Sequence, residues 1–339
     1  MADVIPTVKF EKPALPTLWL DTSVVIKLAK IKKGERLQEI EVERGRRLHD
    51  LIVHLVHNAK LLCPESDQEE EYAAERLDKD VHGMFAELSL GISLTHRQGI
   101  LDEQIFKGME AYIKKSDTIH LPASSYFHDD PVSSLHEALE RPFIITVGPL
   151  KSPEILDRRA RAKVEISQRW EELRKQFVAE KRTYEKQLEL EILGHWDGLV
   201  ELLRRWEEGM RSGLYDFWGL MGATGALLYR SVWSDLGGQP KGWEGVDRFF
   251  RSPYFAELPV PFIGSRLGAE LLTGNEPIAS GDPMDVNLLS VALPIARYVV
   301  MDRRMEMRIK KLGLDANFGV QVYSMSSIDG LFTQLESLK

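Results

Sequence analysis

The stretch LWLDTSVVIKLAK, residues 18–30, determines the fold class, because it has the pattern of a strand followed by a helix. The rest of the chain repeats this pattern. Its first three residues form an apolar run typical of a buried strand. Val24, Val25 and Leu28 then recur at helical spacing. Asp21 lies where the strand ends and the helix begins. An aspartate at that point is either the N-cap of the helix or a ligand-binding group at the end of a strand.

The same alternation of strand and helix continues on both sides of a long middle section. Apolar periodicity predicts a helix over 35–58, a short buried strand at Leu61–Cys63 and a further helical stripe up to Leu88. Near the other end, the pattern predicts a helix over 285–296, a strand at Tyr298–Met301, a basic helix, a strand at 320–323 and a final helix. Such alternation indicates a mostly parallel sheet covered on both faces.

The middle section is expected to be helical. Ser152-Pro153-Glu154 is a good helix start, and a charged amphipathic pattern follows towards Glu208. The pattern favours a helical hairpin or one long helix, broken near Gly194, with another helix around 217–233. The expected organisation is therefore a first core part at 1–130, a helical insertion at 131–211 and a second core part at 212–339.

Composition restricts the class of protein. A chain of 339 residues, 43% hydrophobic and 28% charged, is able to bury a sizeable core. The formal net charge of -8 means that a polyanion must be met by a local patch or through bound cations. The single cysteine, Cys63, excludes an internal disulfide and fits a reducing cytosol. No apolar window is long enough for a membrane span, so we expect a cytoplasmic protein without a membrane segment.

Acidic residues recur at the predicted strand ends. Asp21 and Asp302 each follow a strand directly, and Asp282 and Asp285 open the helix before the second of these strands. Another acidic cluster follows the strand at Leu61–Cys63; it contains Glu65, Asp67, Glu69, Glu70 and Glu71. In open parallel sheets, ligands bind outside the carboxyl ends of the strands. The four acidic positions are therefore expected to meet at one edge of the sheet.

Carboxylates that meet at one edge repel each other unless a cation compensates them. Oxygen ligands select Mg²⁺ or Mn²⁺, which bind substrate phosphates and lower the pKa of bound water. The chemistry indicated is hydrolysis of a phosphodiester. Such a cation also explains how an acidic protein can bind a nucleic acid.

The order of these motifs resembles PIN-domain nucleases. The motifs are LWLDTS, the acidic segment after LLCP, DPMDVNLLSVA and YVVMD, and the resemblance covers roughly the first 90 and the last 60 residues. It implies a three-layer α/β/α fold with a central, mostly parallel sheet, to which this chain adds a large helical insertion. Each motif alone is weak, and their order carries the resemblance.

The resemblance also implies roles for individual residues. The metal ligands and catalytic residues would be Asp21, Asp285, Asp302 and either Glu70 or Glu71, with Asp282 as an additional or alternative ligand. Thr22 and Ser23 match the small hydroxylated residues beside the first aspartate and are expected at the substrate. Arg303 and Arg304 follow Asp302 directly and are expected to contact phosphates.

Each of these features also has an ordinary structural interpretation. Asp21 and Asp302 are good N-caps, and Glu69, Glu70 and Glu71 suit the first turn of a helix. The glycines of GLMGATGALL, Gly219, Gly222 and Gly225, lack the Lys-Ser/Thr of a phosphate loop, so close helix packing explains them better. Only the joint placement of the acids favours a metal site.

The sequence thus predicts a metal-dependent nuclease with RNA favoured over DNA as the substrate. One alternative is a catalytically silent scaffold whose helical insertion binds a protein partner. Arg297 is compatible with that reading, because some PIN relatives place an acid there. Another alternative is a toxin or defence effector that a protein partner controls. The pattern leaves the oligomeric state open.

Overall fold

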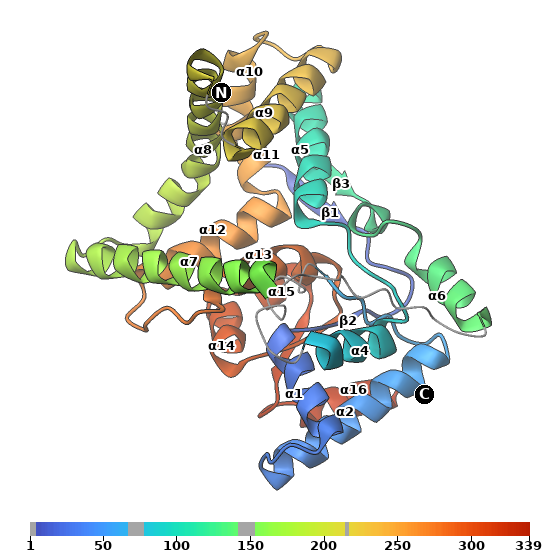
Figure 1. Cartoon of the computed structure of the whole chain (residues 1–339). Helices are drawn as coiled ribbons and strands as arrows, with labels where there is room; N and C mark the ends of the chain where they lie inside the picture. Colours follow the sequence, from blue (N-terminus) through green and yellow to red (C-terminus); the bar gives the residue numbers. More distant parts are fainter. Residues whose placement is uncertain (1–4, 67–77, 142–152, 214–216) are drawn as a thin grey trace.

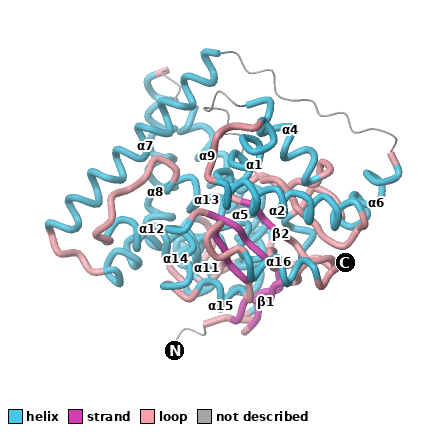
Figure 2. Tube along the Cα trace, turned by 90° about the horizontal axis from the view of Figure 1, so that it is seen from below, coloured by secondary structure: helices cyan, strands magenta, loops and turns pink. Residues whose placement is uncertain are grey.

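Three short parallel strands lie near the centre of the molecule, with helices around them (Figures 1 and 2). The structure is a computed structural model that describes residues 5–66, 78–141, 153–213 and 217–339. The strands are β2 (Leu18–Leu20), β4 (Tyr298–Met301) and β5 (Gln321–Ser324), in the order β2-β4-β5. The chain is therefore mixed α/β, predominantly helical, with a small parallel sheet, as the alternation predicted.

The segment expected to form a strand at Leu61–Cys63 is reduced to a single bridge. Leu62 pairs in parallel with Thr17, on the side of β2 away from β4. All three residues of the segment are nonetheless buried, as an inner strand would be. A second parallel pair, which the sequence pattern did not predict, joins β1 (Thr7–Phe10) to β3 (Thr118–Leu121).

The two faces of the sheet belong to two different hydrophobic cores. Leu18, Leu20 and Val300 point into one core, and Trp19 and Val299 point into the other. Successive side chains of a strand point to opposite faces, which explains this alternation. Both faces of the sheet are apolar because helices cover both.

Helices at both ends of the chain supply the two covers. The first core receives side chains of α1 (Thr22–Lys33), α2 (Glu39–His57), α4 (Asp78–Ser89) and α16 (Asp329–Glu336). The second core receives those of α12 (Pro259–Thr273), α13 (Asp282–Ile295), α14 (Arg303–Lys311) and α15 (Leu314–Phe318). The helices predicted from periodicity near both chain ends are thus confirmed.

The middle of the chain builds a helical region, most of which lies above the sheet in Figure 1, with α6 to its right. Its elements are α5 (Arg97–Lys114), η1 (Ala123–Tyr126), α6 (Pro131–Glu140), α7 (Pro153–Ala179), α8 (Tyr184–Ser212), α9 (Phe217–Asp235), α10 (Trp243–Phe250) and α11 (Pro253–Ala256). The segment forms two helices joined by a short turn, and α7 and α8 point in different directions in Figure 1 instead of packing together as a hairpin. In the part of the chain that the structure describes, no helix combines the length and the apolar character that crossing a membrane requires.

The expected break near Gly194 is wrong. Helix α8 continues through this glycine, and the chain turns earlier, where Lys181 has a positive φ of 53°. A glycine inside a helix costs only about 1 kcal/mol relative to alanine. Packing of α8 against α9 and α12, with Trp196 buried, offsets such a cost.

Close approach of α8 and α9 explains one glycine of the GLMGATGALL segment, Gly222. A Cβ on Gly222 would lie 2.6 Å from the Cβ of Leu202, whereas a Cβ on Gly225 would have no atom within 4 Å. Packing, and not phosphate binding, therefore accounts for Gly222.

These two glycines give a matched pair of variants. Gly222→Ala should be less stable than Gly225→Ala by about 1–3 kcal/mol, because the added methyl group overpacks the helix contact. The helix-propensity gain of alanine is common to both variants and cancels in the comparison. Urea unfolding followed by circular dichroism measures the difference. Equal free energies of unfolding would contradict the close helix contact.

Candidate functional site

Two of the predicted aspartates leave neighbouring strands at the same edge of the sheet. Leu20 of β2 pairs with Val300 of β4, and the backbone N–H of Asp21 donates to the Val300 carbonyl at 2.8 Å. Asp302 follows Met301, the last residue of β4. Parallel pairing thus brings Asp21 and Asp302 to the carboxyl ends of adjacent strands, where such sheets bind ligands.

Asp21 is both a helix cap and a buried carboxylate. Its side chain is only 5% exposed and accepts hydrogen bonds from the Ser23 amide at 3.3 Å and from the Ser23 hydroxyl. Ser23 is exposed at this edge, whereas Thr22 is fully buried and faces the core. Of the two hydroxyl groups expected at a substrate, the structure thus presents only that of Ser23 to solvent.

Asp302 caps the helix that follows it. Its carboxylate accepts from the amides of Arg304 at 2.7 Å and Met305 at 3.2 Å, so it satisfies two of the free N–H groups of α14. Arg303 is exposed. The Arg304 side chain donates to the carbonyl of Pro277 at 2.8 Å.

Asp282 and Asp285 form the first turn of α13, where the helix dipole favours negative charge. Asp282 is 4% exposed, and its carboxylate lies 3.5 Å from Arg308 and 3.6 Å from Arg304. Asp285 is 9% exposed. Two arginines thus neutralise the charge of Asp282.

The predicted glutamate ligands cannot be placed. Glu70 and Glu71, together with Asp67 and Glu69, lie outside the described residues. Among the residues that are described, no three His, Cys, Asp or Glu side chains come close enough together to hold a metal ion. Asp21, Asp285 and Asp302 are all described, so the structure does not bring these three carboxylates together around one position.

One buried acid near this edge was missed by the sequence reasoning. Glu306 lies one turn after Asp302 on α14, is 6% exposed, and accepts from Ser327 at 2.9 Å and Lys310 at 2.6 Å. Burial would raise the pKa of Glu306, but hydrogen bonds from Lys310, Ser324 and Ser327 hold the pKa below its usual value. The segment RRMEMRIKK was interpreted as a basic helix, and its spacing from Asp302 was the signal that could have found Glu306.

Glu65, a member of the acidic cluster after the Leu61–Cys63 segment, is half-buried. Burial raises the pKa of its carboxyl group, and the charge of His82 opposes the rise. The next residue, Ser66, accepts a hydrogen bond from the indole of Trp19 at 3.3 Å. Glu65 therefore stays close to β2 through the bridge at Leu62 and this bond.

Cys63 has no nucleophilic character. It is fully desolvated, and burial raises the pKa of its thiol to about 12. The thiolate, which is the reactive form, is therefore absent at neutral pH.

Comparisons of this chain with protein-family models, with curated proteins and with solved structures find no match.

The segment that leads into α13 is fastened to α7. Arg174 binds Glu171 in a bidentate pair at 2.8 Å and donates to the Gly274 carbonyl at 3.1 Å. Glu171 in turn accepts from the Ile278 amide at 2.9 Å. The hydrogen bond from Arg174 lowers the pKa of Glu171 to about 2, and the bond from Ile278 acts in the same direction. This clamp fixes the chain just before Asp282 and Asp285.

The clamp predicts a pH-dependent contribution to stability. Because the folded-state pKa of Glu171 is lowered, its contribution is complete above the ordinary value of 4.5 and is lost as pH falls towards about 2. Glu171→Gln should lower the free energy of unfolding by about 1–2 kcal/mol at neutral pH. The difference in the free energy of unfolding between Glu171→Gln and wild type should shrink as pH falls from 4.5 towards about 2.

Urea unfolding at a series of pH values tests this expectation. Glu172→Gln is the control, since Glu172 is the exposed neighbour on the same helix. If the loss of free energy of unfolding in Glu171→Gln stays the same from neutral pH down to about pH 2, the carboxylate charge does not hold the clamp.

Proposed function

We propose that the chain is a PIN-like, metal-dependent nuclease that hydrolyses phosphodiester bonds. The observation that carries the proposal is the emergence of Asp21 and Asp302 from the adjacent parallel strands β2 and β4. Asp285, buried in the first turn of the helix before β4, supports it. The resemblance of the motif order to PIN nucleases favours RNA over DNA as the substrate.

The proposed ligands fit Mg²⁺ or Mn²⁺ in their chemistry, because they offer carboxylate oxygens, and those of Asp21 and Asp285 are buried. Asp21, Asp285 and Asp302 would hold the ion, and Glu70 or Glu71 would complete the set. The ion would supply Lewis acidity towards the phosphate and a lowered pKa for bound water. The three-layer PIN-like arrangement of the core belongs to the same proposal.

The residues of the chain would position the substrate. The exposed hydroxyl group of Ser23 and the exposed guanidinium of Arg303 lie next to Asp21 and Asp302 in the sequence. The Arg303 guanidinium is therefore able to donate hydrogen bonds to phosphate oxygens near the carboxylates, whereas the Ser23 hydroxyl donates to Asp21 and orients its carboxylate. The Asp302 carboxylate also orients the first turn of α14 through its two amide bonds, and so fixes the backbone that carries Arg303.

Substitution of Asp21 separates catalysis from folding. Asparagine is as good an N-cap as aspartate, so Asp21→Asn should keep α1 intact. It removes one charged metal ligand, so cleavage should fall by more than the roughly 10–100-fold typical of losing a residue that only supports a ligand. The assay is cleavage of labelled RNA and single-stranded DNA with Mn²⁺.

The matched control is Asp130→Asn. Asp130 also caps a helix, through a 2.8 Å bond from the Ser133 amide, but it is exposed and belongs to α6. This variant should cleave as wild type does. Full activity of Asp21→Asn would remove Asp21 from the site.

Metal binding should be visible without any substrate. Saturating Mn²⁺ should stabilise the wild-type protein by about 2.7 kcal/mol when its concentration is 100 times the Kd, and a chelator should reverse the effect. Asp130→Asn should respond equally, and Asp21→Asn should respond much less. Thermal unfolding monitored by circular dichroism across a Mn²⁺ titration provides the readout.

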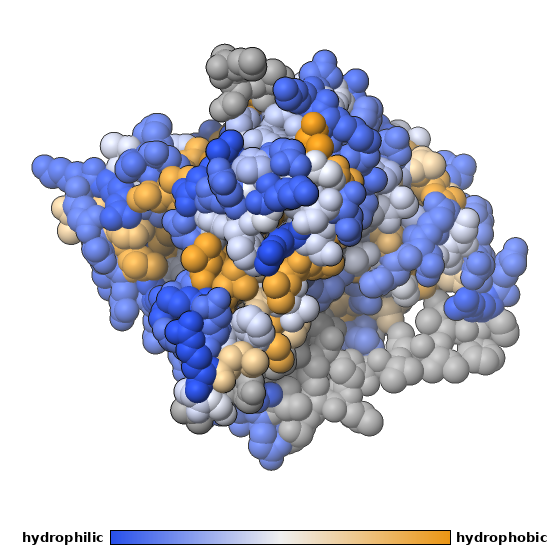
Figure 3. Space-filling model, turned by 90° about the horizontal axis from the view of Figure 1, so that it is seen from above, coloured by the Kyte–Doolittle hydropathy of each residue, from blue (hydrophilic) through white to orange (hydrophobic). Residues whose placement is uncertain are grey.

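One observation favours the second candidate, an interaction scaffold or a partner-controlled effector. Figure 3, which looks down on the end of the molecule that carries α8, α9 and α10, shows hydrophobic side chains gathered between hydrophilic ones. The exposed large hydrophobic residues of α8 and α9 are Leu190, Val200, Met210, Leu220, Met221, Leu227 and Leu228. Exposed apolar surface of this kind suits a protein partner. A scaffold needs no metal, so the lack of a saturable Mn²⁺ effect would favour it.

A further inference from the structure

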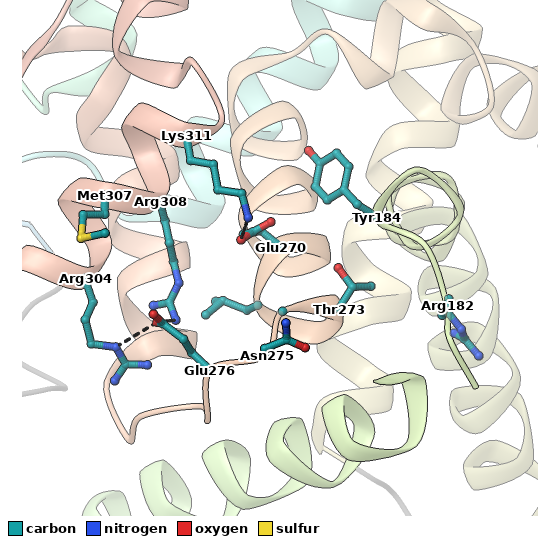
Figure 4. Close-up of a pocket in the computed structure, with 12 residues that line it drawn as sticks. Arg182, Tyr184, Glu270, Thr273, Asn275, Glu276, Arg304, Met307, Arg308 and Lys311 are labelled. Atoms are coloured by element: carbon teal, nitrogen blue, oxygen red, sulfur yellow. Dashed lines mark hydrogen bonds and ion pairs between the residues drawn. The ribbon is translucent and has the colours of Figure 1, made fainter. Parts of the chain in front are cut away.

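A cavity of about 580 Å³ opens beside α14, on the side of the helix that carries its cationic side chains. Its walls are α14, the end of α12 and the turn between α7 and α8 (Figure 4). The volume lies within the range of about 300–1,000 Å³ that is usual for small-molecule sites. Asp21 and Asp285 do not line this cavity.

The lining has a positive balance in a protein whose net charge is -8. It contains four cations, Arg182, Arg304, Arg308 and Lys311, against two carboxylates, Glu270 and Glu276. Arg304, Arg308 and Lys311 are spaced by four and three residues on α14 and therefore share one face of the helix. Figure 4 shows this face turned towards Glu270 and Glu276. Outside the lining, Glu180 pairs with Arg182, and Asp282 pairs with Arg304 and Arg308, so an anion would enter by replacing a carboxylate on these arginines.

Arg308 carries the strongest indication of a ligand. The residue is 7% exposed, and its Nη1 atom is buried without a hydrogen-bond partner among the described residues. The nearest carboxylate to Nη1, that of Asp282, lies 3.5 Å away, beyond good hydrogen-bond distance. A buried guanidinium whose N–H groups are incompletely paired gains from an additional acceptor.

The carboxylate of Glu276 marks where that acceptor would lie. It is 3.1 Å from Arg308 and 3.5 Å from Arg304, as the dashed lines in Figure 4 show. The Glu276 side chain is 64% exposed, so it can move away at little cost. Guanidinium groups bind phosphate with the same planar geometry as carboxylate. A phosphate would therefore take the place that Glu276 occupies between the two arginines.

The opposite wall offers contacts for the rest of a nucleotide. Tyr184 presents a half-buried ring, and Thr273 and Asn275 lie between this ring and the cations of α14 (Figure 4). Aromatic rings stack on bases of any sequence. Hydroxyl and amide groups suit the polar edges of a sugar or base.

We propose that this cavity binds one nucleotide, with its phosphate on Arg304 and Arg308 and its base against Tyr184. The ligand class is a nucleoside monophosphate unit, either free or at the phosphorylated end of a strand. This assignment does not depend on the proposed nuclease activity, because none of its contacts involves Asp21, Asp285 or Asp302.

Isothermal titration calorimetry in the presence of a chelator tests the site. The ligands are adenosine monophosphate, adenosine, and a short oligonucleotide with or without a 5′-phosphate. Adenosine monophosphate should bind at least about 10-fold more tightly than adenosine, because charge-assisted hydrogen bonds hold the phosphate. If the phosphorylated oligonucleotide binds and the free nucleotide does not, the ligand of the cavity is the phosphorylated end of a strand. Equal binding of both would identify the nucleotide itself.

Two variants should change the affinity in opposite directions. Lys311→Gln removes a cation whose side chain is 67% exposed, so the fold is kept, and should weaken adenosine monophosphate binding about 10-fold. Glu276→Gln removes the competing carboxylate and should tighten binding several-fold. Lys186→Gln and Glu189→Gln are the controls, since both residues are exposed on α8 and neither lines the cavity.

Three results would overturn the assignment. One is the absence of binding by any phosphorylated ligand at millimolar concentration. Another is equal affinity for adenosine and its monophosphate. The third is an unchanged affinity in both Lys311→Gln and Glu276→Gln. Asp21→Asn should bind adenosine monophosphate as wild type does, so failure of the nuclease proposal and failure of this one give different results.

Discussion

Pairing of β2 with β4 is the contact on which the arrangement of the chain depends. Leu18–Leu20 and Tyr298–Val300 are neighbours in the sheet although most of the sequence lies between them. Closing so long a loop costs entropy, and burial of the two strands on both faces is what offsets it. Because the pairing is parallel, the residues that follow each strand meet at one edge. Asp21 and Asp302 are at this edge for that reason alone.

The same pairing determines how the two ends of the chain share the core. Trp19 points to the face covered by α12, α13 and α14, while Leu18 and Leu20 point to the face covered by α1 and α2. Helices from the last third of the chain therefore cover a strand from the first tenth. A shift of β2 by one residue would exchange the two faces and place Trp19 in the other core.

The elements at the two chain ends were predictable because their signals are local. Asp21 and Asp302 are N-caps after apolar strands, and the structure gives both that geometry. The break near Gly194 was predicted from a local signal that tertiary packing overrides. The pairing of β1 with β3 was not predictable, because it joins Thr7–Phe10 to Thr118–Leu121 across intervening helices.

The residues of the candidate site also fall into those that local signals predict and those whose contacts depend on distant segments. The local positions of Asp21 and Asp302 at helix N-caps, and of Asp285 in a first turn, were predictable because they depend on neighbouring residues. The pairing of Asp282 with Arg304 and Arg308 depends on how α13 packs beside α14, and no spacing in the sequence reveals it. For that reason Asp282, expected to hold a metal, pairs with two arginines, and Arg304, expected to contact phosphates, is bound to Pro277, Glu276 and Asp282.

Helix α14 connects the acidic edge to the basic cavity. Its N-terminus carries Asp302, and its side carries Arg304, Arg308 and Lys311. Asp282 lies between the two regions and shares both arginines with Glu276. An anion that displaced Glu276 would compete with Asp282 for the same guanidinium groups. Any such competition would act on the first turn of α13, because Asp282 lies in that turn.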